Sequence, residues 1–195
     1  MLNPRAREGD LTAKARIRNA AMDLFAQHGE SRVSLRAVAA EAEVTLGLVQ
    51  HHFKTKAGLR EAVDQLVVDY FAAAVASVPP EGSPAEVAAG RDDAVRKMLQ
   101  DNPAVVNYVR RVVLEPDAPG TQLLRSLIDL TRQEIGILRK SGLASTQRTE
   151  SEQVVAVMLR QLGDLLLAPL VDAVWDEVAE PGDAVRPRLA ITLEK

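Results

Sequence analysis

The chain contains no cysteine, few aromatic residues and no long apolar run. The absence of cysteine excludes disulfides, thiolate metal ligands and cysteine nucleophiles across all 195 residues. The longest apolar runs, at residues 70–76 and 165–171, end after seven residues, whereas a membrane-spanning helix needs about 20. The polar first ten residues lack the apolar core of a signal peptide. We therefore expect a soluble, cytoplasmic protein without a membrane partner.

The residues that are present favour helices. Apolar residues make up 47% of the chain and charged residues 26%, enough to bury a core. Aromatic residues make up only 3%, and alanine, leucine, valine, arginine and glutamate are abundant. Because strand-type alternation is scarce as well, this mixture predicts an all-α fold.

Charge is unevenly distributed along the chain. The formal net charge of -3 argues, taken whole, against a nucleic-acid partner. Residues 1–60 nevertheless hold ten Lys/Arg against six Asp/Glu, a net charge of +4, and the remainder carries -7. A basic front on an acidic body places any polyanionic partner at the front.

Prolines and glycines divide the chain into helix-length segments. Ser34, Thr45 and Thr55 are predicted N-caps, and Ser83 and Glu86 form a predicted capping box. The expected helices cover residues 12–28, 35–41, 46–53, 56–78, 84–100, 103–114, 119–140 and 149–178, with a short terminal helix at 184–193.

Residues 34–53 have the shape of a DNA-reading helix-turn-helix: a short helix, a tight turn and a second helix. Val38, Val44, Val49 and Phe53 can reach the apolar stripe of the preceding helix, which comprises Ile17, Ala20, Ala21, Leu24 and Phe25. Helices this short must pack on one another to be stable. The segment therefore predicts a three-helix head.

The exposed face of the second helix is unusual for a soluble protein. Leu46, Gly47 and Leu48 gain nothing from facing water, but they suit a helix end that enters the major groove. Gly47 lets the backbone come close, either leucine can meet a thymine methyl group, and Gln50 can bond an adenine edge or a phosphate. The alternative is local packing of Leu46 or Leu48, in a helix-turn-helix that does not read DNA.

Charged and imidazole groups surround this helix. Lys56 and Arg36 lie in the first turns of helices, where the helix dipole disfavours a cation by about 0.3–1 kcal/mol. Their placement suggests an external anion such as a DNA phosphate; the alternative is an ordinary solvated cation. His51 and His52 project about 100° apart and cannot both bind one metal ion. We therefore expect no metal site, a phosphate contact from His52, and a base or phosphate contact from His51.

Residues 12–63 resemble the DNA-binding region of TetR/AcrR-family transcriptional regulators. The matching positions are Ala20, Ala21, Leu24, Phe25, Gly29, 34–39, 44–49, His52, Phe53, Thr55, Lys56 and Leu59. The resemblance implies a DNA-facing surface of Ser34, Arg36, Thr45, Leu46, Gly47, Leu48, Gln50, His51, His52 and Lys56. Two residues depart from the pattern. Glu43 replaces the usual turn glycine, which suggests an adjusted turn, and Gln50 replaces a tyrosine that commonly touches the phosphate backbone.

The body carries no motif of its own. We divide the chain into a DNA-binding domain, residues 1–55, and a helical ligand-binding and dimerisation domain, residues 56–195, joined by the long helix at 56–78. Residues 154–178 are apolar on every side, which suggests a two-fold interface. Its predicted contacts are Met158, Leu162, Leu165, Leu166, Leu170 and Val174. The alternative is a central helix wrapped by its own domain.

Evidence for a ligand site in the sequence is weak. A small-molecule pocket, which the resemblance implies, can be lined by Tyr70, Phe71, Met98, Tyr108, Met158 and Trp175, although each of these also fits an ordinary core. Asn107, Arg111 and Glu115 share the polar face of one predicted helix, and we interpret Arg111 and Glu115 as a solvated i, i+4 pair.

These patterns predict a regulator rather than an enzyme. The chain shows no catalytic grouping outside the head, no glycine-rich phosphate loop and no HExxH motif, so we expect no enzymatic activity and no cofactor. The leading hypothesis is a homodimeric repressor that binds double-stranded operator DNA and is released by a small-molecule effector. A transcriptional activator of the same fold and a helical protein-interaction module without DNA binding are the alternatives.

Overall fold

A computed structural model describes residues 12–114, 121–180 and 182–183, and every regular element in these ranges is helical. This confirms the predicted all-α fold. The elements are α1 (Ala13–His28), the 3₁₀ helix η2 (Glu30–Arg32), α2 (Leu35–Glu41), α3 (Leu46–Phe53), α4 (Lys56–Ala76), α5 (Pro84–Asp101), α6 (Pro103–Leu114), α7 (Thr121–Lys140) and α8 (Glu150–Val178). The terminal helix expected at 184–193 lies outside the described residues.

Side-chain caps begin the helices where the sequence predicts them. The hydroxyls of Ser34, Thr45, Thr55 and Ser83 each accept a hydrogen bond from the backbone N–H three residues later, at 3.0–3.3 Å. The Glu86 carboxylate in turn accepts a hydrogen bond from the Ser83 backbone N–H at 2.8 Å, which completes the predicted capping box. These caps satisfy N–H groups that have no partner within their helix and fix the start of each one.

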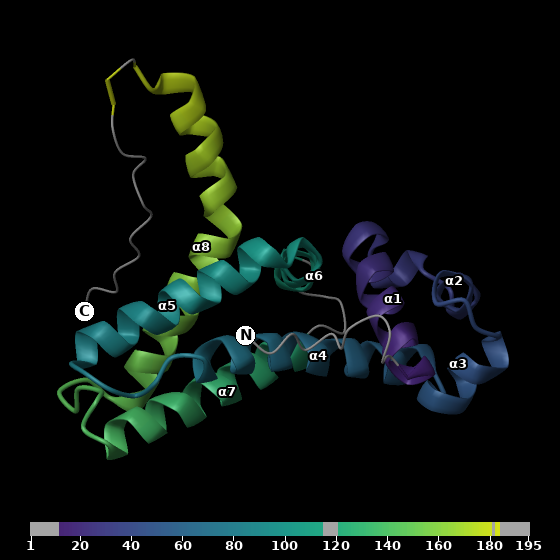
Figure 1. Ribbon diagram of the computed structural model, residues 1–195, viewed down its shortest axis with the longest axis horizontal. Helices are drawn as coiled ribbons and strands as arrows, with labels where there is room; N and C mark the ends of the chain where they lie inside the picture. Colours follow the sequence, from purple (N-terminus) through teal and green to yellow (C-terminus); the bar gives the residue numbers. More distant parts are fainter. Residues whose placement is uncertain (1–11, 115–120, 181, 184–195) are drawn as a thin grey trace. The chain divides into compact units, whose positions relative to one another are not determined.

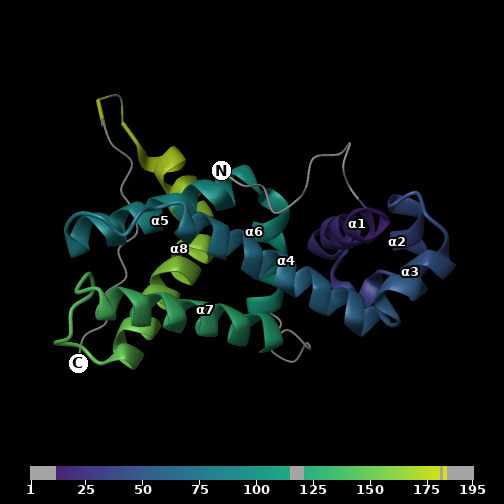
Figure 2. The same cartoon turned by 60° about the horizontal axis from the view of Figure 1, so that its bottom comes forward.

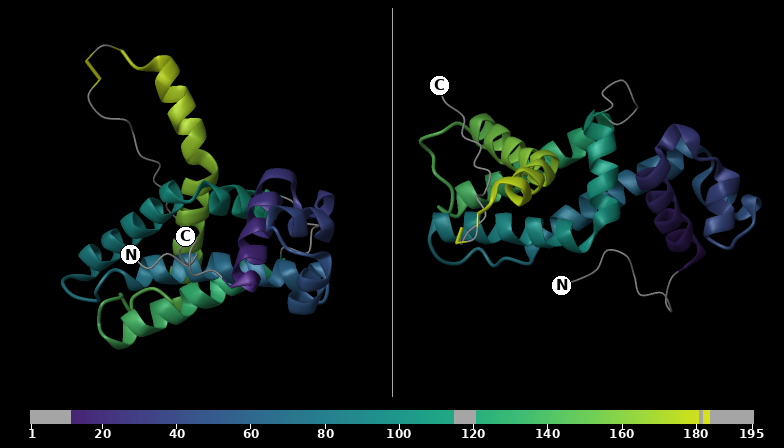
Figure 3. Two further views of the ribbon diagram at one scale, coloured as in Figure 1. Left: turned by 45° about the vertical axis from the view of Figure 1, so that its right-hand side comes forward. Right: turned by 90° about the horizontal axis from the view of Figure 1, so that it is seen from above.

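The chain divides into two compact units, Met1–Leu127 and Ile128–Lys195. In the first unit, α1 lies between α6 on one side and α2 and α3 on the other (Figures 1, 2 and 3). Helix α4 contacts α1, α3 and α5. We call α1, η2, α2 and α3 the head. The predicted boundary between a DNA-binding and a ligand-binding domain, after residue 55, is defined by function, whereas the compact units divide after Leu127. The functional boundary stays a prediction.

The head has the apolar core that the sequence predicts. Ile17, Ala21, Val38 and Val49 are fully buried, and Phe25 is 1% exposed. Leu24 and Val44, which we expected in the same core, are only half-buried. Met22 and Ala26 are also buried, although they lie outside the predicted stripe. Helix α1 is therefore covered on more than one side, as expected for a helix between α6 and the helix-turn-helix.

The second unit holds the long helix α8, which continues through Pro169. Its predicted interface residues separate into three groups. Met158 and Leu165 are buried within the chain, with the Met158 sulfur 3.3 Å from the Thr131 hydroxyl of α7, whereas Leu170 and Val174 are more than half exposed. Leu162 and Leu166 are half-buried. One side of α8 is thus covered by the rest of the chain, and the other side is exposed to solvent.

The open side of α8 is a stripe of large apolar side chains. At about 100° per residue, they fall within an arc of roughly 140°. The stripe comprises Val155, Leu159, Leu167, Leu170, Val174 and Val178. By length and composition alone, α8 is also long and apolar enough to cross a membrane, a test that the core helix of a soluble protein passes as well.

Candidate nucleic-acid interface

The turn between α2 and α3 keeps a left-handed residue although it lacks a glycine. Glu43 has φ +52°. Its N–H bonds the Ala40 carbonyl at 3.1 Å, and the Val44 N–H bonds the Ala39 carbonyl at 2.9 Å. These two bonds form a Schellman motif with Glu43 at the position that glycine usually occupies. The turn has therefore not been adjusted to suit glutamate, contrary to what the departure from the family pattern suggested, and Glu43 bears the backbone strain.

Replacing Glu43 by glycine should raise the free energy of unfolding by about 1 kcal/mol. Glycine removes a left-handed penalty of about 1–2 kcal/mol and loses part of that gain through its larger unfolded-state entropy. Glu41→Gly is a matched control, because it removes the same charge from the last turn of α2 and should destabilise by about 0.5 kcal/mol. Urea denaturation of the two variants measures both changes. Two shifts of the same sign would contradict the assigned strain.

Helix α3 presents most of its predicted DNA-facing residues to solvent. Gly47, Gln50 and His51 are exposed, and Leu46 and Leu48 are half-buried. The half-burial of these leucines is compatible both with base contact and with local packing. A Cβ added at Gly47 would meet only the Thr45 hydroxyl oxygen, at 3.9 Å. The fold itself therefore does not require glycine at this position.

The remaining predicted contacts lie around α3. Ser34, Arg36 and Thr45 are exposed, and His52 and Lys56 are half-buried. The imidazole rings of His51 and His52 lie edge to face with their centroids 5.3 Å apart. Arg36 forms no hydrogen bond or ion pair with the described part of the chain. Its charge in the first turn of α2 is therefore directed at solvent.

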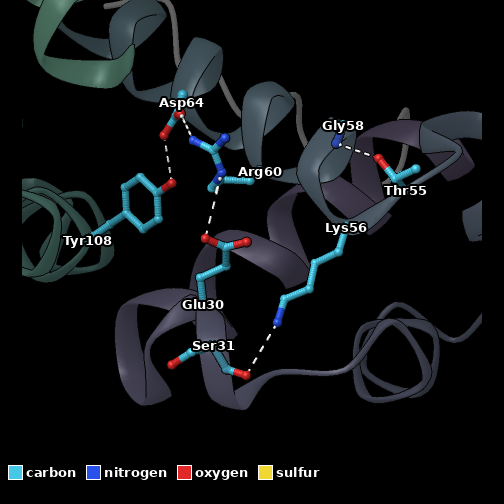
Figure 4. Close-up of polar contacts among 8 residues, drawn as sticks. All are labelled: Glu30, Ser31, Thr55, Lys56, Gly58, Arg60, Asp64 and Tyr108. Atoms are coloured by element: carbon cyan, nitrogen blue, oxygen red, sulfur yellow. Dashed lines mark hydrogen bonds and ion pairs between the residues drawn. The ribbon is translucent and has the colours of Figure 1, made fainter. Parts of the chain in front are cut away.

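Lys56 has a partner that sequence reasoning missed. Its ammonium group donates to the Ser31 carbonyl of η2, at 3.4 Å (Figure 4). The position of this cation at the start of α4 is thus explained in part within the protein, and it indicates an external anion less strongly than we inferred. An ammonium carries three donors, so one bond to Ser31 leaves Lys56 able to contact a phosphate.

The junction between α3 and α4 is a strained γ-turn. Lys54 at its centre has φ +60° and ψ -57°, and the Thr55 N–H bonds the Phe53 carbonyl at 2.6 Å. A Cβ added at Gly58 would overlap that same Phe53 carbonyl oxygen. Glycine is therefore required at position 58, and the sequence signal was an isolated glycine in the first turn of a long helix.

Side chains of η2, α4 and α6 form a series of polar contacts that connects the head to α4 and α6. Asp64 is the one buried charged side chain among the described residues, at 4% exposed. It accepts hydrogen bonds from the Tyr108 hydroxyl at 2.6 Å and from Arg60 at 3.2 Å. The Arg60 guanidinium also lies 3.6 Å from the Glu30 carboxylate of η2 (Figure 4). A single chain of contacts thus runs from η2 through α4 to α6.

Burial shifts the pKa values of two groups in this chain of contacts, the Asp64 carboxyl and the Tyr108 hydroxyl. It raises the pKa of the Asp64 carboxyl, although the Tyr108 hydroxyl and the Arg60 charge both oppose that rise. Burial and the nearby Asp64 charge also raise the pKa of the Tyr108 hydroxyl. Tyr108 therefore keeps its proton and remains a donor to Asp64.

The interpretation of Arg111 as a solvated partner of Glu115 is wrong. Arg111 is half-buried and donates to the carbonyls of Ala26 at 2.9 Å and Gln27 at 2.7 Å, at the C-terminus of α1. These are carbonyls in the last turn of a helix, which have no partner within it and which carry partial negative charge. Sequence reasoning missed this role because the partners lie 84 and 85 residues away. Glu115 lies outside the described residues.

The six pocket candidates are distributed over both units. Tyr70, Phe71, Met98 and Tyr108 are buried in the first unit, and Met158 is buried in the second. Trp175, also in the second unit, is half-buried. The Tyr108 hydroxyl is committed to Asp64. These residues stay a prediction as ligand contacts.

Comparisons with known proteins agree with the geometry of the head. The family model described as bacterial regulatory proteins, tetR family, matches residues 17–63. The HTH-type transcriptional regulatory protein RaaS of Mycobacterium tuberculosis is 52% identical over 63 residues, which are 32% of this chain and 29% of that protein. The chain thus aligns with less than a third of this curated relative.

Solved structures match the head together with the body. The multidrug binding protein EbrR, crystallised with imidazole, is 25% identical with a TM-score of 0.59, over 88% of this chain and 85% of that one. A transcriptional regulator from Rhodococcus sp. Rha1 is 22% identical with a TM-score of 0.67, over 84% and 87%. Residues 17–63 thus match the tetR family of bacterial regulatory proteins, and the chain shares its helical fold with these two solved structures.

Proposed function

We propose that this protein is a cytoplasmic, homodimeric transcriptional repressor that binds operator DNA through α3 and is released by a small-molecule effector. The observation that carries DNA binding is the open face of α3, where Gly47 has space for a side chain yet has none. A backbone left bare at the N-terminal end of an exposed helix suits close approach to a base edge or a phosphate. Arg36 and the net charge of +4 over residues 1–60 supply the attraction to phosphates.

The open stripe on α8 supports the dimer. A second copy of the same helix, placed across a two-fold axis, would bury the stripe in an isologous interface. Two heads related by that axis can then meet half-sites about 34–36 Å apart on a pseudo-palindromic operator. Release by a small molecule is supported by likeness to EbrR, which is a multidrug binding protein crystallised with imidazole. An activator of the same fold is the second candidate, because the features of the head suit both roles.

Gly47→Ala tests the proposal, because it should separate DNA affinity from stability. Alanine fits the space in α3 and favours the helix by about 1 kcal/mol. If the backbone approaches DNA, the new methyl group should nevertheless lower affinity for the preferred duplex about tenfold, equivalent to about 1.4 kcal/mol. The preferred duplex is first obtained by selection from random sequence. Fluorescence anisotropy then gives the affinity, and thermal unfolding gives the stability.

Gly136→Ala is the control, since an added Cβ at this position of α7 meets no described heavy atom within 4 Å. It should leave DNA affinity unchanged while it also favours its helix. A wild-type protein that fails to bind any duplex at low salt would overturn DNA binding and favour a protein-interaction module. Transcription in vitro from a promoter that contains the selected duplex separates the two regulatory roles, since a repressor lowers it and an activator raises it.

A further inference from the structure

Two side chains of α6 bond separate helices at two points, one bonding α4 and the other bonding α1 of the head. Tyr108 and Arg111 are three residues apart and so lie on neighbouring turns of one face of the helix. Tyr108 bonds Asp64 of α4 at 2.6 Å, and Arg111 bonds the carbonyls of Ala26 and Gln27 at the end of α1. These partners are 44 to 85 residues away in sequence, so the bonds define a tertiary arrangement and not a local turn.

The first point reaches the head through Asp64 and Arg60. A carboxylate 4% exposed is costly to bury unless its oxygens are bonded, and both are: Oδ1 by Tyr108 and Oδ2 by Arg60. Arg60 faces Glu30 of η2 at 3.6 Å with only 12% of its side chain exposed. Apolar packing tolerates small sliding motions, whereas these directed bonds favour one register of η2, α4 and α6.

The second point acts on α1 directly. A guanidinium presents its N–H donors in a fixed planar fork, and Arg111 uses Nε and Nη2 on two successive carbonyls. Bonding both carbonyls at once fixes the direction of the end of α1 and not only its distance from α6. Gly29 follows directly, and a Cβ there would lie 3.7 Å from Nη1 of Arg111. The guanidinium therefore sits closely against the end of α1.

We propose that Tyr108 and Arg111 are positioning residues that set the angle at which α3 is presented to DNA. Helix α6 contacts α1, and α4 contacts α1, α3 and, through Arg60, η2, while α2 packs on α1 and α3 packs on both α1 and α2. A shift of α6 that broke these bonds would free the end of α1 while leaving the head folded. Because α3 packs on α1, it would then no longer be held at one angle. The inference rests on the proposed function, because it supplies the link between the body and operator recognition.

The test compares two DNA affinities in the variants Tyr108→Phe and Arg111→Lys. Tyr108→Phe removes only the hydroxyl, and Arg111→Lys keeps the charge but cannot bond two carbonyls as a planar fork. Each should lower affinity for the selected operator about tenfold. Affinity for a scrambled duplex of equal length should stay within about twofold, since the phosphate contacts of the head remain. Operators whose half-site spacing is changed by one base pair should be discriminated less sharply than by wild type.

The control is Lys97→Met, which alters an exposed cation of α5 in the same unit and should change neither affinity. Thermal unfolding recorded beside each titration shows that the variants are folded. Parallel loss of affinity for operator and scrambled duplex, or full retention of operator affinity and spacing preference in both variants, would overturn the positioning role. A wild-type protein without preference for operator over scrambled duplex would instead refute the proposed function, so the two failures can be told apart.

Discussion

Replacing Gly58 by alanine should destabilise the protein by about 1–3 kcal/mol and lower its affinity for operator DNA. Helix propensity alone predicts the opposite sign, a gain of about 1 kcal/mol for alanine in a helix. The added Cβ, however, would overlap the Phe53 carbonyl oxygen, which is backbone and cannot rotate away. That carbonyl is held by the γ-turn bond from Thr55 at 2.6 Å. Relief therefore requires α3 and α4 to move apart, at a cost typical of overpacking.

The loss of DNA affinity in Gly58→Ala should exceed what unfolding explains. The γ-turn at Lys54 sets the angle between α3 and α4. If the added methyl group forces this turn to open, α3 tilts relative to the rest of the head. Thermal unfolding gives the change in stability, at about 2–4 °C per kcal/mol for a chain of this size. Anisotropy with the selected duplex, well below the unfolding temperature, gives the change in affinity.

Gly136→Ala again serves as the matched control. The same substitution in α7, with open space around the added methyl group, should raise the unfolding temperature slightly. If Gly58→Ala also raised the unfolding temperature, this result would contradict the assigned overlap of a Cβ at position 58 with the Phe53 carbonyl oxygen. Because the two variants differ only in what surrounds the new methyl group, opposite signs isolate the effect of the junction from helix propensity.

The sequence predicted those parts of the head that depend on neighbours in the chain. Caps such as Ser34 and Thr45 bond N–H groups three residues away, and the stripe of α1 repeats every three or four residues. Both signals are local, so periodicity and capping rules found them. The same rules located α3 and the exposure of Gly47, Gln50 and His51 on it.

Contacts between distant parts of the chain could not be read in this way. Arg111 looked solvated because its own helix offers Glu115 as a partner at i+4, and nothing nearby points to the end of α1. Asp64 and Tyr108 are likewise unremarkable until the fold brings α4 and α6 together. Glu43 and Lys54 show a related limit, since a sequence does not say whether a non-glycine residue avoids a left-handed conformation or accepts its cost.

Leu170→Glu together with Val174→Glu should convert the protein to a monomer and lower operator affinity at least about 100-fold. Both side chains lie on the open stripe of α8, at 61% and 51% exposed, so the substitutions create no cavity in the isolated chain. In a two-fold interface each change acts twice, and carboxylates would be buried against apolar partners. Loss of the second head then removes the gain from bivalent binding, which is about 10²–10⁴ in affinity.

Sedimentation velocity and anisotropy measure the two effects, with Gln133→Glu and Ser151→Glu combined as the control. This pair adds the same charge to exposed polar positions of α7 and α8 and should leave both the dimer and DNA binding intact. The α8 stripe also allows a different occupant, a lipid surface, since the helix is long and apolar enough to enter one. A wild-type protein that is monomeric in solution and floats with phospholipid vesicles would therefore overturn the dimer. A dimer that persists in the glutamate variant would show that the two copies meet through another surface.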